Sequence, residues 1–394
     1  MEYIKLANIV RIIPGYAIPS NCMTGRGTPI IKITNIKADN TLDLQNTVRY
    51  NQPISSKLRK FILKSKDILV CMTGATIGKI ARQIEVGENY IVNQRVAIIR
   101  PENPDDFDYV YYALTTSAFR RYVELVGYGA AQPNISGEAI GDFRLNYDSR
   151  QEKRKTIGGM LFQYDVLIAN NNRRIRILEQ MAENLYKEWF SYEKIQKVSS
   201  EVRFGEIIQI VRGLSYSTEE IDVDKGINLI NLKNIQSFGG FRHDGTKLYA
   251  GKYKREQVVD CGNLIMGVTD MTQDRRTVGS VALVPKIDGI SVISADLIKI
   301  LSKIDNVFLF AMFKYGNVSK YISQFANGAN VLHLRPQAVL NIKVMLPPQD
   351  IIDKYICIAK PLFNEIEQLN QTNQNLIKQR DMLLPRLMSG KLEV

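Results

Sequence analysis

The stretch QEKRKTIGGMLFQYDVLIANNNRRIRILEQ, which opens at Gln151, has a counterpart that opens at Gln349, QDIIDKYICIAKPLFNEIEQLNQTNQNLIKQ. Position 151 and position 349 are separated by an offset of 198 residues, about half of the 394-residue chain. Upstream, the run IKITNI from Ile31 is echoed by INLKNI from Ile230. A repeat of this length indicates two copies of a whole domain rather than a solenoid of short units.

Both stretches carry a heptad pattern of apolar residues, with a and d positions three or four residues apart. In the first, the a positions are Leu161, Ile168, Ile175, Ala182 and Trp189, and the d positions are Tyr164, Asn171, Leu178 and Leu185. In the second, the a positions are Ile366, Asn373, Arg380 and Leu387, and the d positions are Leu362, Leu369, Leu376 and Leu383. Four heptads favour an antiparallel coiled coil with a pseudo-twofold axis over two amphipathic helices that each pack on their own domain.

Three details of this helix pair are predicted from single residues. Asn171 and Asn373 are expected to fix its register, as polar a and d residues do. Pro385 is expected to end or kink the second helix about one turn early. A first helix from about Lys155 to Phe190 would be about 50 Å long at 1.5 Å per residue, which exceeds one turn of DNA, about 34 Å. Such a helix would act as a ruler between the two globular blocks.

Each globular block alternates short apolar runs with turn residues. In the first block we expect strands at 30–33, 67–72, 91–92 and 96–99 and a helix from Asp108 to Leu125. In the second block we expect strands at 263–266 and 291–293 and a helix from Val307 to Tyr321. This mixture predicts an α+β fold, with α/β-type globular domains repeated twice. The predicted divisions are residues 1–148 and 197–346 for the two globular domains, and 149–196 and 347–394 for the helices.

The composition is that of a basic globular chain. A formal charge of +12 and a pI of about 9.3 favour a polyanionic partner. No window of about 18 apolar residues is present, so we expect no membrane span, and the N-terminal MEYIKLANIVRIIP is a poor signal peptide because Arg11 interrupts it. Four scattered cysteines without CxxC spacing indicate reduced thiols and a cytoplasmic protein.

The sequence lacks the usual constellations of catalysis. Its only two histidines, His243 and His333, both lie in the second half, so we do not expect a zinc site or Cys/His nucleophilic catalysis repeated in both halves. The segment Gly74–Ile80 is one residue shorter than a phosphate-binding loop and has Ile80 where a hydroxyl is needed, so we interpret it as strand, turn and strand. No catalytic residue and no metal site is predicted.

Basic and amide side chains in the loops are the candidates for DNA contact, because lysine and arginine bind phosphates while arginine, asparagine and glutamine match base edges. In the first half the candidates are Arg26, Lys32, Lys57, Arg59, Lys60, Lys79, Asn93, Gln94, Arg95, Gln132 and Asn134, with Arg82 as a further basic residue. In the second half they are Lys233, Lys254, Arg255, Thr269, Gln273, Arg275, Arg276, Asn330 and His333. These loops diverge between the halves, which fits two modules that read different sequences.

A globular block, a Gly-rich turn and then a glutamine that opens a long helix, all present twice, resemble the specificity (S) subunit of type I restriction-modification systems. The residues that carry the resemblance are LPPQDII at 346–352, more weakly LNYDSRQ at 145–151, LLPRLMSGKL at 383–392 and LVCMTG at 69–74. The first copy lacks the prolines found at 347–348. The resemblance covers the whole chain.

The resemblance implies a non-catalytic subunit with two target-recognition domains that read the halves of a bipartite double-stranded DNA sequence. The helices would set the spacer and dock two methyltransferase (M) subunits, and restriction (R) subunits would complete the complex. Adenine methylation with S-adenosylmethionine, and cleavage driven by ATP with Mg²⁺, would belong to those partners, so this chain itself needs no cofactor.

Two alternatives remain at this point. The chain could be the target-recognition subunit of another DNA-modifying defence complex, which the genes beside it would distinguish. It could also be a coiled-coil adaptor that holds proteins, in which case DNA binding would lack the steep salt dependence that phosphate contacts produce.

Overall fold

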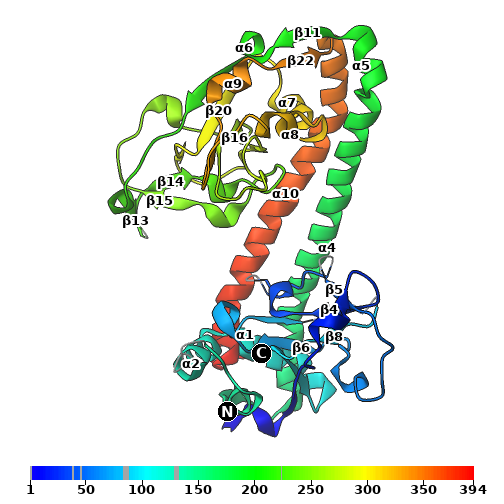
Figure 1. Ribbon diagram of the computed structural model, residues 1–394. Coiled ribbons are helices and arrows are strands. Elements are labelled where there is room, and N and C mark those ends of the chain that lie inside the picture. The colour runs from blue at the N-terminus through cyan, green and yellow to red at the C-terminus, as the bar shows by residue number, and fades with distance from the viewer. Residues whose placement is uncertain (1, 38–39, 45–46, 83–87, 128–132, 223) are drawn as a thin grey trace. The chain divides into compact units, whose positions relative to one another are not determined.

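The computed structural model describes residues 2–394 except 38–39, 45–46, 83–87, 128–132 and 223 (Figure 1). The chain forms two compact units, which we call unit 1 (Met1–Asn170 with Asn373–Val394) and unit 2 (Asn171–Thr372). Each unit combines small sheets, short helices and part of the two longest helices, so the predicted mixed α and β content is confirmed.

Unit 1 contains two four-stranded sheets. The first is antiparallel and has the order β2 (Val10–Pro14), β9 (Val96–Pro101), β6 (Ile68–Cys71), β7 (Ile80–Arg82). The second has the order β3 (Met23–Thr24), β5 (Val48–Tyr50), β4 (Thr28–Ile31), β8 (Ile91–Val92), with β4 and β8 parallel. The strand β1 (Glu2–Lys5) pairs with β10 (Arg144–Tyr147), and the short helices are α1 (Phe107–Thr115), α2 (Ser117–Gly127) and α3 (Gly137–Gly141).

Unit 2 contains sheets with the same strand orders. The first runs β12 (Ile208–Arg212), β20 (Leu297–Ser302), β16 (Leu264–Gly267), β18 (Val281–Leu283). The second runs β13 (Ile221–Asp222), β15 (Lys247–Tyr249), β14 (Ile227–Ile230), β19 (Ser291–Ile293), again with one parallel pair, β14 and β19. Two further strand pairs are β11 (Ser200–Arg203) with β22 (Lys343–Leu346) and β17 (Thr269–Asp270) with β21 (Leu332–His333). The short helices of the unit are α5 (Tyr192–Val198), α6 (Phe204–Ile207), α7 (Asn306–Tyr315), α8 (Val318–Ser323) and α9 (Pro336–Leu340).

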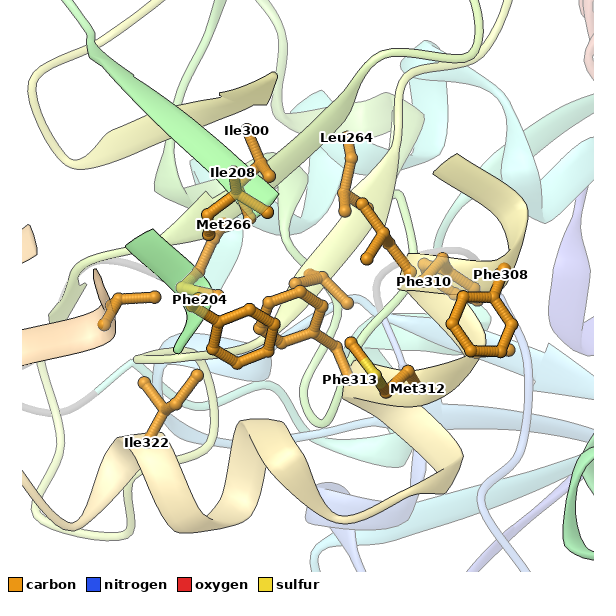
Figure 2. Packing of buried hydrophobic residues seen from close by; sticks show 14 of the residues in the cluster. Phe204, Ile208, Leu264, Met266, Ile300, Phe308, Phe310, Met312, Phe313 and Ile322 are labelled. Atoms are coloured by element: carbon orange, nitrogen blue, oxygen red, sulfur yellow. The ribbon is translucent and has the colours of Figure 1, made fainter. Parts of the chain in front are cut away.

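The core of unit 2 forms between its first sheet and helix α7. Phe204 and Phe313 stack with ring centroids 5.0 Å apart, and Ile208, Leu264 and Met266 project toward them from the strands (Figure 2). Nearly every residue of α7 is buried, which follows from a sequence, NVFLFAMFKY, that is apolar on all sides. Burial of a side chain of this size contributes about 1.5–3 kcal/mol, so this cluster fixes the sheet on which the loops of the unit are mounted.

The two longest helices are α4 (Gln151–Trp189) and α10 (Gln349–Met388). Each of the predicted a and d residues on both helices is buried or half-buried. Within unit 1, Arg380 of α10 donates to Asp165 of α4 over 2.6 Å; within unit 2, Arg174 of α4 donates to Glu365 of α10 over 2.7 Å. Asn373 is among the buried residues of the seam.

The prediction that Pro385 could end the second helix is wrong, because α10 continues through it to Met388. Pro385 is exposed, whereas Leu387 and Met388 are buried in the core of unit 1. That burial offsets the cost of about 3 kcal/mol that proline imposes on a helix interior. Ser389 also donates its backbone N–H to the carbonyl of Pro385, which closes the last turn.

Both predicted helices of the globular blocks are in fact broken in two. The first breaks at Thr116, whose backbone is extended and whose hydroxyl donates to the carbonyl of Ala113 over 2.7 Å. The second breaks at Gly316 and Asn317, where Asn317 adopts the left-handed conformation (φ 61°) that favours helix ends. The expected strands are present within one or two residues of their predicted bounds, and Gly74–Thr76 form the expected turn between β6 and β7.

Among the residues that the structure describes, no helix is long and apolar enough to cross a membrane.

Candidate nucleic-acid interface

In unit 1, candidate side chains from three separate segments meet at the end of strand β6. The backbone N–H of Cys71 donates to the carbonyl of Lys79, and that of Met72 donates to the carbonyl of Arg95, both over 2.9 Å. Thr73 forms a β-bridge with Asn134. Gln94, Arg95 and Asn134 are exposed there, and Lys79 is half-exposed. The sheet therefore gathers two cations and two amides, the side chains that recognise phosphates and bases.

In unit 2, the equivalent end of strand β16 gathers a second set. β17, which follows it, pairs with β21, so that Thr269 lies opposite His333. The loop after β17 is joined to the turn that precedes β21, because Gln273 donates to the carbonyl of Ala329 over 2.9 Å. The structure thus brings together six of the predicted residues, Thr269, Gln273, Arg275, Arg276, Asn330 and His333, on two adjoining loops.

Asp270 organises the loop that carries these arginines. Its carboxylate accepts the backbone N–H of Thr272 over 2.9 Å and the backbone N–H of Thr277 over 2.7 Å. Burial raises the pKa of Asp270, but these hydrogen bonds outweigh it and hold the pKa below its ordinary value. The carboxylate is therefore charged at neutral pH and holds both ends of the loop in place.

A second basic group occupies the same structural position in both units. Arg59 and Arg255 are each the first residue of a short 3-10 turn, Arg59–Phe61 in unit 1 and Arg255–Gln257 in unit 2. The residue after each turn forms an isolated β-bridge, to β8 in unit 1 and to β19 in unit 2. Both arginines are exposed. Beside them lie the exposed candidates Lys57, Lys60 and Lys254. An exposed cation at a repeated position is suited to a phosphate contact, which fixes orientation without reading sequence.

The remaining candidates differ in accessibility. Arg26 and Lys233 are exposed and Lys32 is half-buried. Asn93 and Thr269 are buried, and the hydroxyl of Thr269 donates to Asp296 over 2.9 Å, so it braces the loop. Gln132 lies outside the described residues.

Arg82, the further basic residue, is not available to DNA. Its guanidinium is buried, donates to Asp108 over 2.7 Å and to Asp165 over 3.0 Å, and lies over the ring of Tyr111. Both carboxylates are far from it in sequence, so no local pattern could have predicted these partners. The arginine instead joins β7 to α1 and α4 within unit 1.

Sequence reasoning missed one exposed aromatic residue beside the unit 2 loops. Phe238 donates its backbone N–H to the carbonyl of Arg276 over 2.8 Å, so the segment 236–241 adjoins the arginine loop. The available signal was the sequence Ser-Phe-Gly-Gly at 237–240, where two glycines mark a backbone conformation that other residues avoid.

No group of three or more histidine, cysteine, aspartate or glutamate residues that could hold a metal ion occurs in the part of the chain that the structure describes. A cavity of about 180 Å³ next to the unit 2 loops is lined by Arg212, Thr269, His333 and neighbouring apolar residues. The arrangement is one of cationic and amide groups on loop tips, which is suited to binding a polyanion.

Comparison with known proteins agrees with this geometry. Residues 1–180 match the family model described as the type I restriction modification DNA specificity domain. The type I restriction enzyme MjaIX specificity subunit of Methanocaldococcus jannaschii is 23% identical over 357 residues, covering 84% of this chain and 78% of that protein. The HindI specificity subunit of Haemophilus influenzae is 20% identical over 381 residues, covering 77% of this chain and 82% of that protein.

A solved structure shows the same fold. The crystal structure of the type I restriction-modification S subunit from M. genitalium superposes with a TM-score of 0.61 and 16% identity, covering 98% of this chain and 95% of that one. The first 180 residues of this chain therefore match the type I DNA specificity domain, and relatives that are named type I specificity subunits are similar to it over most of its length.

Proposed function

We propose that this chain reads a bipartite DNA sequence, with one half-site contacted by each unit. The observation that carries the proposal is that each unit places arginine and amide side chains at the equivalent end of an equivalent four-stranded sheet, on loops of different sequence. A common framework with different tips is what two different half-sites require. The globular domains, residues 1–148 and 197–346, would each act as one reader.

We further propose that α4 and α10 pair as an antiparallel coiled coil that sets the distance between the half-sites. One support is that every a and d residue is buried or half-buried. Another is the two ion pairs Arg380–Asp165 and Arg174–Glu365: the residue number rises along α4 from the first pair to the second and falls along α10, as in an antiparallel pair. A helix of 39 residues, the length of α4, measures about 58 Å at 1.5 Å per residue. The pseudo-twofold arrangement would follow from this pairing.

The helices are also the proposed docking surface for two methyltransferase subunits. Apolar side chains are exposed on both, at Met160, Leu167, Ile177 and Met181 of α4 and at Ile358, Ile377 and Met382 of α10. Where α4 ends, a pocket of about 330 Å³ is lined by Trp189, Ile195, Val198, Pro347 and Ile351, with Lys194 and Lys197 at its edge. Exposed apolar residues on a helix are typical of protein interfaces. Methylation and cleavage, with their S-adenosylmethionine, ATP and Mg²⁺, would then belong to partner M and R subunits.

The first experiment is a map of modified bases in the host genome with and without the gene for this chain. Loss of one bipartite N6-methyladenine motif would support the proposal and would give the target sequence. If the methylome is unchanged, DNA binding by the complex is measured against salt. A flat dependence would contradict the proposal and favour a coiled-coil adaptor, because phosphate contacts produce a steep slope.

Domain exchange tests the division of labour. Replacement of residues 1–148 by the corresponding segment of a relative with another target is expected to change one half-site and leave the other and the spacer unchanged. Replacement of residues 197–346 is the matched control and should change only the other half-site. A change in both half-sites from one exchange would contradict independent readers.

The ruler function has its own test. Deletion of one heptad from both α4 and α10 preserves the a and d register while it shortens each helix by about 10 Å. The expected result is a shorter spacer with unchanged half-sites. Deletion from one helix alone, which mismatches the pair, serves as the control and should abolish activity. An unchanged spacer after the paired deletion would contradict the ruler.

A further inference from the structure

Phe238 combines exposure with a strained backbone. Its side chain is 67% exposed, and its φ angle is 65°, in the left-handed region that aromatic residues rarely adopt. The two following residues, Gly239 and Gly240, also have positive φ. Strain of this kind persists only where the surrounding structure holds it, and it is concentrated at ligand-contacting sites.

The segment 236–241 is tied to the rest of unit 2 by two backbone hydrogen bonds and is closed by hydrogen bonds within itself. The backbone N–H of Phe238 donates to Arg276, that of Gly239 donates to Gln236 and that of Gly240 donates to Val281, over 2.8–2.9 Å. The aliphatic chain of Lys314 packs below Gly239, and its ammonium lies 3.9 Å from Glu179 of α4. Phe238 therefore projects from a loop whose backbone is held in place before any partner binds.

The chemistry around Phe238 is that of a DNA-contacting surface. Arg275 and Arg276 lie on the adjoining loop, and Arg275 donates to the carbonyl of Ala326 over 3.5 Å. The neighbouring residue Phe325 and its ring partner Tyr321, 5.2 Å away, are also exposed. Apolar wedges next to arginines are the means by which proteins unstack a base step and bend a duplex.

We propose that Phe238 is a DNA wedge, whose ring inserts against a base step of the half-site contacted by unit 2. This inference rests on the proposed function. The corresponding stretch of the sequence in unit 1, Lys37-Ala-Asp-Asn-Thr, contains no aromatic residue. The wedge therefore belongs to one half-site only, and it makes that half-site sensitive to how easily its base steps unstack.

The test uses the full chain in complex with its methyltransferase subunits and a duplex that carries the motif identified in the methylome. Each step of the unit 2 half-site is labelled in turn with 2-aminopurine, whose fluorescence rises on unstacking. Phe238→Ala is expected to weaken binding by about 5-fold to 140-fold, the range for loss of one base–aromatic stack, and to abolish the fluorescence rise at one step. The salt slope should not change, because Phe238 carries no charge.

Three further variants separate the wedge from a structural role. Phe238→Gly suits the positive φ, so it should lose binding as Phe238→Ala does while its thermal midpoint stays at or above that of the parent. Phe238→Leu, another wedge residue, should retain most of the affinity. Tyr3→Ala removes an equally exposed aromatic side chain from β1 and should leave both readouts unchanged.

The outcomes distinguish this inference from the function on which it rests. If the parent complex prefers the bipartite duplex and Phe238→Ala binds within twofold of it with the same fluorescence, the wedge is wrong and the specificity function stands. If the parent complex has no preference for the bipartite duplex over a scrambled one, the proposed function fails and the wedge fails with it.

Discussion

Units 1 and 2 attach the same two helices to the same kind of sheet, but by different chemistry. In unit 1, Arg82 at the edge strand and Arg380 of α10 share the carboxylate of Asp165 on α4. Burial lowers the pKa of Arg380, but Asp165 and Asp381 outweigh that effect and raise it above its ordinary value. The attachment is a buried ionic network.

In unit 2 the corresponding positions are apolar. In unit 1, Arg82 of the edge strand β7 lies opposite Ile68 of β6. In unit 2, the residue of the edge strand β18 that lies opposite Leu264 of β16 is Leu283. The residue 198 positions after Asp165 in the sequence is Phe363. Phe363 meets Phe310 of α7 edge to face at 5.5 Å. The two units thus share a strand order, while the side chains that join sheet to helix are ionic in one and apolar in the other.

The largest effect is expected from Arg82→Ala. Removal of the buried guanidinium takes one cation from each of the half-buried carboxylates Asp108 and Asp165, which keep Lys66 and Arg380, and should lower the stability of unit 1 by about 3–5 kcal/mol. Hydrogen exchange of the β6 and β7 amides, measured beside those of β16 and β18, reports each unit separately. Lys5→Ala removes an exposed ion pair with Asp142 of equal length, 2.7 Å, and should cost less than about 1 kcal/mol. Equal losses in the two variants would show that the Arg82 network contributes no more to stability than an exposed ion pair does.

A double-mutant cycle sharpens the same comparison. Arg82→Ala together with Asp165→Ala removes both charges, so the double variant should be more stable than the sum of the single losses predicts. The expected coupling is about 1–3 kcal/mol. Additive losses, measured by the same exchange experiment, would show that Arg82 acts through Asp108 and its ring contacts and not through Asp165.

Acid should affect the recognition loop of unit 2 and spare that of unit 1. The pKa of Asp270 is lower in the folded protein than its ordinary value, so its stabilisation is complete above that value and is lost as the pH falls through the lowered pKa. The amides of Thr277 and Val278 should therefore exchange faster, after correction for intrinsic rates, below about pH 4. Asp270→Asn should weaken the loop by about 1–3 kcal/mol at neutral pH and abolish this pH dependence. In unit 1 the residue that corresponds to Asp270 is Gly74, which has no carboxylate. A similar acid-induced rise in exchange in the unit 1 loop would therefore contradict the role given to Asp270.

The smallest effect is expected from the repeated arginines. Arg59→Ala and Arg255→Ala should each weaken DNA binding by a similar small factor for every sequence tested. Each should reduce the slope of log affinity against log salt by about one, since each removes one phosphate contact. Binding titrations at several salt concentrations provide the measurement. A loss confined to one variant would show that the two units do not hold DNA in equivalent ways.

The parts of the fold with strong local patterns could be predicted from sequence. Ser291–Ile293 forms a strand as its β-branched residues indicate, and the a and d residues of both long helices face away from water. Pro385 could not be predicted, because the burial of Leu387 that keeps the helix intact depends on a core built from residues far away in sequence.

The candidate site could be predicted by residue type and only in part by position. The convergence of Lys79, Arg95 and Asn134 depends on strand pairing, which brings together segments separated by tens of residues. Arg82 has the same charge as its neighbours, yet its carboxylate partners place it in the interior. Phe238 becomes conspicuous only through its backbone angle and exposure.

The division of the chain into units has a consequence for biosynthesis. Unit 2 is one continuous segment, whereas unit 1 needs residues 373–394, including the buried Leu387 and the carbonyl of Met388 that accepts from Asn146. A ribosome that adds about 5–20 residues per second therefore completes unit 2 before it has made the segment that closes unit 1. The N-terminal unit would be the last to fold, and during that interval its unfinished core is the part of the nascent chain most dependent on chaperones.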